Sequence, residues 1–176
     1  AGFNNVWKNT DNGLRHKWEK ISDFNLPVSN TLKTLAISPT NESYIYAATL
    51  SQLFRTTNGG QSWDMLLNSS NAITSVEVNP DNPLQFFLTK SGYTPNDKVY
   101  YFDGSEFINL SGNLPNIPTN SIVMENTDNF SVYLGTDIGV YYTDFNSGLW
   151  TKLEGSFPNT IVSELEIQNQ EKKVYF

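Results

Sequence analysis

The sequence contains no cysteine, a single histidine and only two arginines among its 176 residues. Without cysteine there are no disulfides, no thiolate catalysis and no cysteine-ligated zinc. The 18 acidic residues outnumber the 11 basic ones, giving a formal charge of −7, so we expect no nucleic-acid partner, because reading phosphates requires clustered cations. Runs of about 20 apolar residues are also absent, which predicts no membrane-spanning helix.

Catalytic and metal-binding patterns are equally scarce. His16 lies between Arg15 and Lys17 in a polar turn, so it has no partner for Ser/His/Asp chemistry, and no Gly-x-Ser-x-Gly elbow or phosphate loop occurs. The carboxylates leave glycoside hydrolysis by an acidic pair open. Most of them, however, fall in turns, such as Asp103, or at outward strand positions, such as Glu77, where solvation explains them. We therefore predict no catalytic residue, no cofactor and no metal.

Four aromatic residues reveal an internal repeat. Trp18, Trp63, Phe107 and Trp150 follow one another at separations of 45, 44 and 43 residues. Alignment on these markers gives four short strand-like segments per repeat, rich in β-branched and aromatic residues and bounded by Asn, Gly, Pro or Ser. We name them A to D in chain order. The A segments are 32–38, 73–78, 121–125 and 162–168; they alternate apolar residues that predict one buried face, for example Leu35/Ile37, Val76/Val78 and Leu165/Ile167.

Four antiparallel strands in 40 to 50 residues are typical of a β-propeller blade. The sequence predicts an all-β fold: a half blade (1–31, strands C and D), three four-stranded blades (32–72, 73–120 and 121–161), and a half blade (162–176, strands A and B). Either the two halves close a small four-bladed ring, or the chain belongs to a larger propeller. We expect the larger propeller, because the sequence starts and stops within strand-like segments and exposed sheet edges promote aggregation.

The turn between strands C and D of the second repeat carries the most specific motif. Residues 56–63 match Ser/Thr-x-Asp/Asn-x-Gly-x-x-Trp through Thr56, Asn58, Gly60 and Trp63. In this interpretation Asn58 bonds nearby backbone groups, Gly60 supplies a positive φ, and the marker aromatic is buried in the blade beside its turn. The motif is a structural device, and the other repeats keep fragments of it.

This motif, called the Asp box, and its period resemble the Asp-box (BNR-repeat) propellers of sortilin-type receptors, photosystem II assembly factors, xyloglucanase-type glycoside hydrolases and sialidases. The resemblance implies a propeller, but this fold hosts many unrelated functions. Sialidases hold their substrate with three arginines, so two arginines exclude that activity. A cysteine-free, acidic, Asn-rich chain of this type resembles segments of large bacterial proteins, which implies secretion or display on the outer surface or in the periplasm.

Binding is expected on the face formed by the B–C and D–A loops, because the opposite face is committed to hairpin turns. Aromatic and amide-rich loops suit protein or glycan contacts. We therefore predict a non-catalytic scaffold or binding module of a larger exported or surface assembly; the alternative is part of a xyloglucanase-type hydrolase. For Phe24 and Phe157, packing between blades is an equal alternative to binding. The candidate binding residues are Phe24, Tyr93, Asp97, Asp137 and Phe157.

Overall fold

A computed structural model describes residues 4–11, 17–24, 26–27, 30–125, 131–145, 147–154, 159–168 and 173–175. Within these ranges all regular structure is β-strand, and no membrane-spanning helix occurs among them. Three four-stranded antiparallel sheets follow one another along the chain. Their strands are β3 (Thr34–Ile37), β4 (Ile45–Ala48), β5 (Gln52–Thr56) and β6 (Asp64–Asn68); β7 (Ile73–Val78), β8 (Phe86–Lys90), β9 (Val99–Phe102) and β10 (Phe107–Asn109); and β11 (Thr119–Glu125), β12 (Ser131–Thr136), β13 (Gly139–Asp144) and β14 (Thr151–Lys152).

A two-stranded antiparallel sheet flanks this series at each end. One contains β1 (Trp7–Asn9) and β2 (Trp18–Lys20), and the other contains β15 (Glu166–Gln168) and β16 (Lys173–Tyr175). These are the predicted C–D and A–B pairs. Each strand pairs with its neighbour in sequence, as expected for blades built from successive hairpins.

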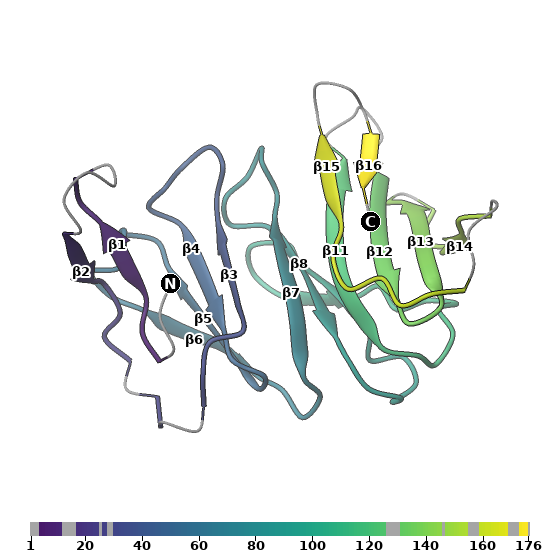
Figure 1. Ribbon diagram of the computed structural model, residues 1–176, viewed down its shortest axis with the longest axis horizontal. Coiled ribbons are helices and arrows are strands. Elements are labelled where there is room, and N and C mark those ends of the chain that lie inside the picture. The colour runs from purple at the N-terminus through teal and green to yellow at the C-terminus, as the bar shows by residue number, and fades with distance from the viewer. Residues whose placement is uncertain are drawn as a thin grey trace.

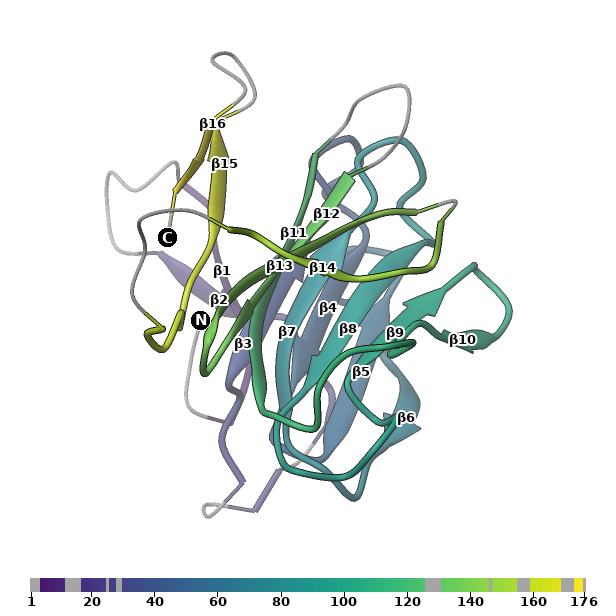
Figure 2. The same ribbon diagram turned by 90° about the vertical axis from the view of Figure 1, so that its right-hand side faces the viewer.

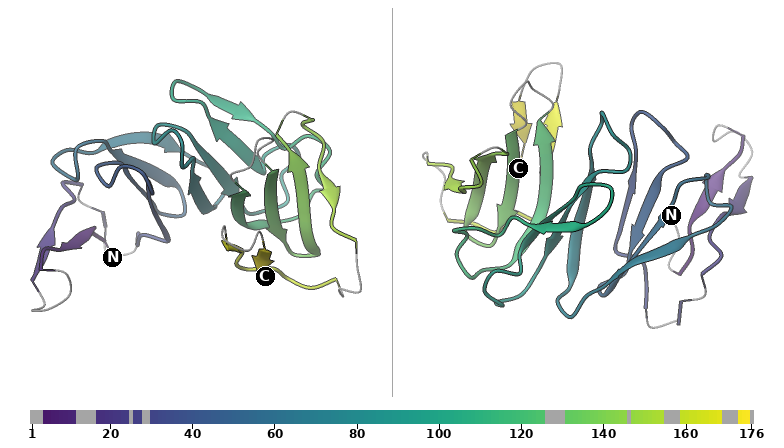
Figure 3. Two further views of the ribbon diagram at one scale, coloured as in Figure 1. Left: turned by 90° about the horizontal axis from the view of Figure 1, so that it is seen from above. Right: turned by 180° about the vertical axis from the view of Figure 1, so that it is seen from behind.

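The sheets lie side by side in chain order along an open arc (Figure 1), and they stack one behind another when the molecule is turned (Figure 2). Seen from above, the pair β15–β16 lies on the concave side of the curve (Figure 3). The A strands neighbour one another, since β7 contacts both β3 and β11, and β11 also contacts β15. The first strand of each blade is therefore innermost, as in a propeller. Because the described β1–β2 and β15–β16 pairs are separate sheets, the four-bladed ring is not formed.

Both faces of the middle sheet are buried, and strand alternation explains how. Phe86 and Leu88 of β8 point to one face and join the core shared with β3–β6, which includes Tyr46. Phe87 points to the other face and joins the core shared with β11–β14, which includes Trp150. All five residues of β8 are consequently buried, although a strand covered on one face only would alternate.

The marker aromatics differ in exposure, which corrects the expectation that each is buried. Trp150 is 4% exposed, Trp63 and Phe107 are half-buried, and Trp18 is 54% exposed. The indoles of Trp63 and Trp150 reach the sheet that precedes their own. Among the described residues no sheet precedes β1–β2, so the ring of Trp18 has no such surface to pack against.

The prediction that the first A strand has one buried face is also wrong. Leu35 and Ile37 are 36% and 53% exposed, whereas Val76 and Val78 on β7 and Leu165 just before β15 are buried as predicted, and Ile167 on β15 is half-buried. The first sheet has only two described strands, and the space beside it remains a cavity of about 350 Å³. Leu35 and Ile37 line this cavity instead of contacting a complete neighbouring blade.

Candidate functional site

The loop 91–98 joins β8 to β9 and is the most exposed aromatic-bearing loop of the predicted binding face. The side chain of Tyr93 is 67% exposed, the largest exposed fraction among the large hydrophobic residues of the described ranges. Residues 69–72 lie beside this loop, because the amide of Ser91 donates to the carbonyl of Ala72 at 2.8 Å. Residues 49–52 lie beside that segment in turn, because the amide of Ile73 donates to the carbonyl of Leu50 at 2.7 Å. These three loops thus follow one another along the predicted binding face.

Asp97 fixes the base of this loop. Its Oδ1 accepts hydrogen bonds from Lys90 Nζ at 2.8 Å and from the hydroxyl of Tyr100 at 2.6 Å, while its Oδ2 accepts one from Asn71 Nδ2 at 2.6 Å. The side chains of Lys90 and Asp97 are only 10% and 16% exposed, so this ion pair is shielded from solvent. Lys90 Nζ also lies 4.3 Å from the centre of the Tyr100 ring, where a cation is attracted to the π face.

Further contacts hold the loop backbone. Lys98 is buried, and its Nζ donates to the carbonyl of Gly92 across the loop. Asn96 adopts a φ of 55°, a left-handed conformation that asparagine tolerates better than most residues, and its carbonyl accepts from Asn109 Nδ2 at 2.6 Å. The loop is therefore tied to β8, β9, β10 and the segment that precedes β7, and Tyr93 is presented from a rigid base.

The electrostatics of the cluster fit an anchored carboxylate. Burial would raise the pKa of Asp97, but hydrogen bonds from Lys90, Tyr100 and Asn71 outweigh it and hold that pKa below its ordinary value. Burial, together with its hydrogen bond to Asp97, raises the pKa of Tyr100 to about 12. Burial lowers the pKa of Lys98, and Asp97 partly opposes this. Asp97 is thus a charged group paired with the cation of Lys90.

Two other predicted residues have packing or bonding roles. Phe24 is half-buried: its ring stacks on Phe54 at 4.4 Å between centroids and meets Trp63 edge-on at 5.3 Å. Packing between blades, the alternative named for Phe24, is therefore what the structure has. Asp137 lies in the turn between β12 and β13 and accepts a hydrogen bond from Asn120 Nδ2 at 3.0 Å. Phe157, like His16, lies outside the described residues.

The turn 56–63 has the internal bonding expected of it. Thr56 Oγ1 donates to Asn58 Oδ1 at 2.8 Å and accepts from the amide of Gly60 at 2.9 Å, and Asn58 Oδ1 also accepts from the amide of Ser62 at 3.0 Å. Gly60 has a φ of 94°. A Cβ on this residue would lie 2.6 Å from Ile21 Cβ, so the close approach of the preceding sheet also requires glycine here. The bonds of Thr56 and of Asn58 Oδ1 stay within the turn, which supports a structural role.

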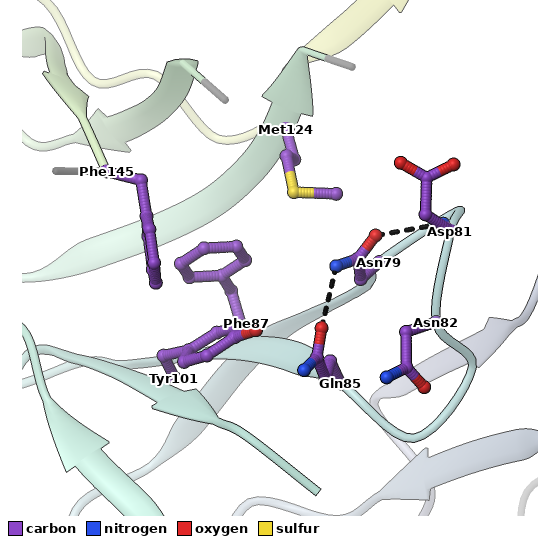
Figure 4. Close-up of a pocket in the computed structure, with 8 residues that line it drawn as sticks. All are labelled: Asn79, Asp81, Asn82, Gln85, Phe87, Tyr101, Met124 and Phe145. Carbon is purple, nitrogen blue, oxygen red and sulfur yellow. Dashed lines mark hydrogen bonds between the residues drawn. The ribbon is translucent and has the colours of Figure 1, made fainter. Parts of the chain in front are cut away.

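A pocket that sequence reasoning missed lies on the opposite face, between the sheets β7–β10 and β11–β14. It has a volume of about 230 Å³ and is drawn in Figure 4. Its residues come from the turn between β7 and β8, from β8, β9 and β11, and from the turn after β13, so no local pattern could have joined them. They are Asn79, Asp81, Asn82, Gln85, Phe87, Tyr101, Met124 and Phe145.

The environment of Glu77 contradicts the sequence interpretation. Glu77 lies on the inner strand β7 and is half-buried rather than freely solvated. Burial raises its pKa to about 7, although a hydrogen bond from the backbone amide of Met124 partly opposes the rise. Among the described residues no group of three or more His, Asp or Glu side chains is placed to hold a metal ion.

Comparison with known proteins identifies the fold. No family model and no curated protein matches the sequence. Similar solved structures include an ancestral GH74 enzyme (22% identity, TM-score 0.65, 89% of this chain), the GH74 xyloglucanase from Xanthomonas campestris (15%, 0.61, 85%), and the extracellular domain of a B. thetaiotaomicron protein assigned to the one component systems (17%, 0.63, 90%). The chain spans 22%, 22% and 21% of these three chains, respectively. The similarity establishes a β-propeller fold.

Proposed function

We propose that this chain is a non-catalytic β-propeller module that binds a protein or glycan partner through the face formed by its B–C and D–A loops. The main observation behind the proposal is the position of Tyr93. Its side chain is 67% exposed, and it lies on a loop whose base is fixed by Asp97. An aromatic ring on a rigid loop offers a large contact area and loses little conformational entropy on binding. Leu50, 49% exposed on a neighbouring loop, extends the apolar part of this surface.

The setting we propose is secreted or displayed on the cell surface, as part of a larger bacterial assembly. The similarity to an extracellular domain and the absence of cysteine support this setting. The bonding within the turn 56–63 likewise supports assignment to the Asp-box (BNR-repeat) propellers of sortilin or xyloglucanase type. Asp97 and Asp137 serve in this proposal as positioning groups for their loops.

The test compares Tyr93→Ala and Tyr93→Phe with Tyr142→Ala, which removes a tyrosine that is 38% exposed on β13. Binding to immobilised β-glucan and xyloglucan oligosaccharides probes glycan recognition. A photo-crosslinking amino acid at position 93 or 142 probes protein contacts. We expect Tyr93→Ala to weaken binding by about 1 to 3 kcal/mol, and Tyr93→Phe and Tyr142→Ala to bind normally. Unchanged glycan binding by Tyr93→Ala, together with equal crosslinking from positions 93 and 142, would refute the proposal.

A second candidate is part of a glycoside hydrolase. Two of the similar structures are GH74 enzymes, and the raised pKa of Glu77, about 7, is one that a general acid requires. The test is turnover of xyloglucan oligosaccharides by the full-length protein. Activity that Glu77→Gln or Asp97→Asn abolishes, and Tyr93→Ala leaves intact, would establish the hydrolase in place of the binding module.

A further inference from the structure

The pocket in Figure 4 lies at a junction between blades where two residues differ from those at the preceding junction. At the junction of β3–β6 with β7–β10, Thr40 Oγ1 donates to the carbonyl of Pro80 at 2.8 Å, and the hydroxyl of Tyr46 donates to that of Pro83 at 2.6 Å. Both donors reach across from one blade to the A–B turn of the next. These two bonds close the junction on its turn face.

One repeat later the same two positions are occupied by Asp81 and Phe87. The correspondence follows from the ladders, since Tyr46 pairs with Ala36 on the preceding strand as Phe87 pairs with Glu77. A carboxylate only accepts hydrogen bonds, and phenylalanine has no polar atom, so neither residue can donate to a carbonyl as Thr40 and Tyr46 do. Here the junction contains a cavity of about 230 Å³, far more than the roughly 30 Å³ that one water molecule takes in the liquid.

The cavity has an aromatic side and an amide side. The rings of Phe87, Tyr101 and Phe145 meet with centroids 4.9 to 5.9 Å apart, and Met124 lies beside them (Figure 4). Phe87 and Tyr101 are nearly buried, whereas Phe145 is half-buried. Such packed rings form a rigid apolar surface.

The amide side is held in place by its own hydrogen bonds. Asn79 Nδ2 donates to Gln85 Oε1 at 3.0 Å, and Asn79 Oδ1 accepts from the amide of Asp81 at 2.9 Å. Asn82 Oδ1 accepts from the amide of Leu84 at 3.1 Å, which orients its Nδ2 group. Within the described part of the chain, Asn82 Nδ2 donates to no protein atom, so it is available to a ligand.

We propose that this pocket binds one neutral pyranose ring, with the C–H edges of the sugar against the aromatic side and its hydroxyls on the amide side. A pyranose carries both apolar C–H groups and hydroxyl groups around its ring, so it matches the two sides of this pocket better than a purely apolar ligand would. Charge limits the class of ligand further. None of the described lining residues is cationic and Asp81 is acidic, so phosphates and acidic sugars are disfavoured. The volume accommodates a single ring.

This site is independent of the loop face. β8 begins at the pocket and ends at the loop that carries Tyr93, so five residues of strand, roughly 16 Å, separate them. Tyr93→Ala, which tests the proposed function, leaves the pocket unchanged. Variants of the pocket likewise leave the loop face unchanged, so the two proposals fail separately.

The chain provides its own reporter and its own control for the test. It has two methionines, Met124 in the pocket and Met65, which is 55% exposed on β6. With ¹³C-methyl methionine labelling, titration with D-glucose, D-galactose, D-mannose or D-xylose should shift the methyl signal of Met124 saturably and leave that of Met65 in place. The expected dissociation constant is on the order of millimolar, as for a ligand of about twelve heavy atoms.

Matched variants test which side of the pocket contacts the sugar. Asn82→Asp keeps the acceptor for Leu84 and removes the free amide donor, so it should weaken sugar binding at least tenfold. Asn41→Asp is its control, because Asn41 occupies the same turn position one blade earlier, where its Oδ1 accepts from the amide of Ser43, and it lines no part of this pocket. Phe145→Ala should weaken binding similarly by removing the half-buried ring.

Four results would overturn the proposal. The first is no shift of Met124 with any of the four sugars up to about 100 mM. The second is an equal shift of the Met124 signal with D-glucuronate, which is charged, or with glycerol, which has no ring. The third is tighter binding of p-cresol, which would assign the pocket to an aromatic side chain of a protein. Sugar binding that survives Asn82→Asp, even if Phe145→Ala does not fold, contradicts the assigned amide contact.

Discussion

Trp63 Nε1 donates a hydrogen bond of 2.7 Å to the carbonyl of Ile21, which lies 42 residues earlier and in the preceding blade. Trp150 makes the same 2.7 Å bond to Leu110, 40 residues earlier. Ile21 and Leu110 each follow directly after the last strand of their own sheet, β2 and β10. Two of the four aromatic residues that reveal the repeat, Trp63 and Trp150, therefore also join one blade to the next, each through a single directional bond.

The first prediction isolates that bond. Trp63→Phe keeps a ring but leaves the carbonyl of Ile21 without its donor, so we expect the free energy of unfolding to fall by about 1 kcal/mol more than ring size alone explains. Trp63→Ala should cost about 3 kcal/mol, at the low end for aromatic residues because the side chain is half-buried. Urea unfolding measures both. Trp18→Phe is the control and should change little, since Trp18 is 54% exposed.

The second prediction separates backbone conformation from close packing in the turn 56–63. Gly59 and Gly60 have φ values of 69° and 94°, so alanine is strained at either. Only at Gly60 would the new Cβ collide, 2.6 Å from both Cβ and the carbonyl oxygen of Ile21, whereas at Gly59 no atom lies within 4 Å. Gly60→Ala should therefore be more destabilising than Gly59→Ala by about 1 to 3 kcal/mol. Equal melting temperatures for the two variants would show that the blades can separate at no cost.

The repeat and its strands could be predicted because they depend on local pattern. The segment 73–78 coincides with β7, and the spacing of the marker aromatics alone predicts where the C–D hairpins lie. The surroundings of particular side chains could not be predicted in the same way. Asp97 receives its bonds from Asn71, Lys90 and Tyr100, which lie on both sides of it in sequence. Their approach depends on how the two hairpins of one blade fold together.

The prediction of side-chain exposure was wrong at positions where a neighbouring blade determines that exposure. Leu35 and Ile37 have the same alternation as Val76 and Val78, yet they face a two-stranded sheet and remain exposed. The pocket was missed for a related reason: Tyr46 and Phe87 look interchangeable as apolar positions, and only the bond from Tyr46 to Pro83 shows what the missing hydroxyl changes.

The third prediction concerns the anchored carboxylate. Asp97→Asn removes one charge of a shielded ion pair and leaves Lys90 uncompensated, so we expect a loss of about 3 kcal/mol in the free energy of unfolding. The matched control is Asp64→Asn, because the Asp64 side chain is 77% exposed and lies 3.9 Å from Arg55; its loss should be below about 0.5 kcal/mol. Denaturant titration at neutral pH measures both, and similar losses would contradict the assigned role of Asp97.

The pKa of Asp97 adds a pH dependence with a definite sign. Its pKa in the folded protein lies below the ordinary value of 3.8, so its contribution to stability is complete above that value and is lost as the pH falls through the lowered pKa. The unfolding free energy of Asp97→Asn should therefore decline less in acid than that of the unmodified chain.

The last prediction concerns Glu77, whose folded pKa is raised from 4.5 to about 7 and whose pH dependence therefore has the opposite sign. The folded chain holds the proton more tightly than the unfolded chain, so the stabilisation is complete below pH 4.5 and is lost as the pH rises from there to about 7. A shift of this size corresponds to at most about 3 kcal/mol.

Glu77→Gln keeps an acceptor for the amide of Met124 without a charge to bury. Its unfolding free energy should therefore exceed that of the unmodified chain above pH 7 and show no such slope between pH 4.5 and 7. Glu106→Gln, at an exposed turn position, should retain the slope. A Glu77→Gln variant that keeps the slope would show that Glu77 is solvated and would remove its claim to act as a general acid.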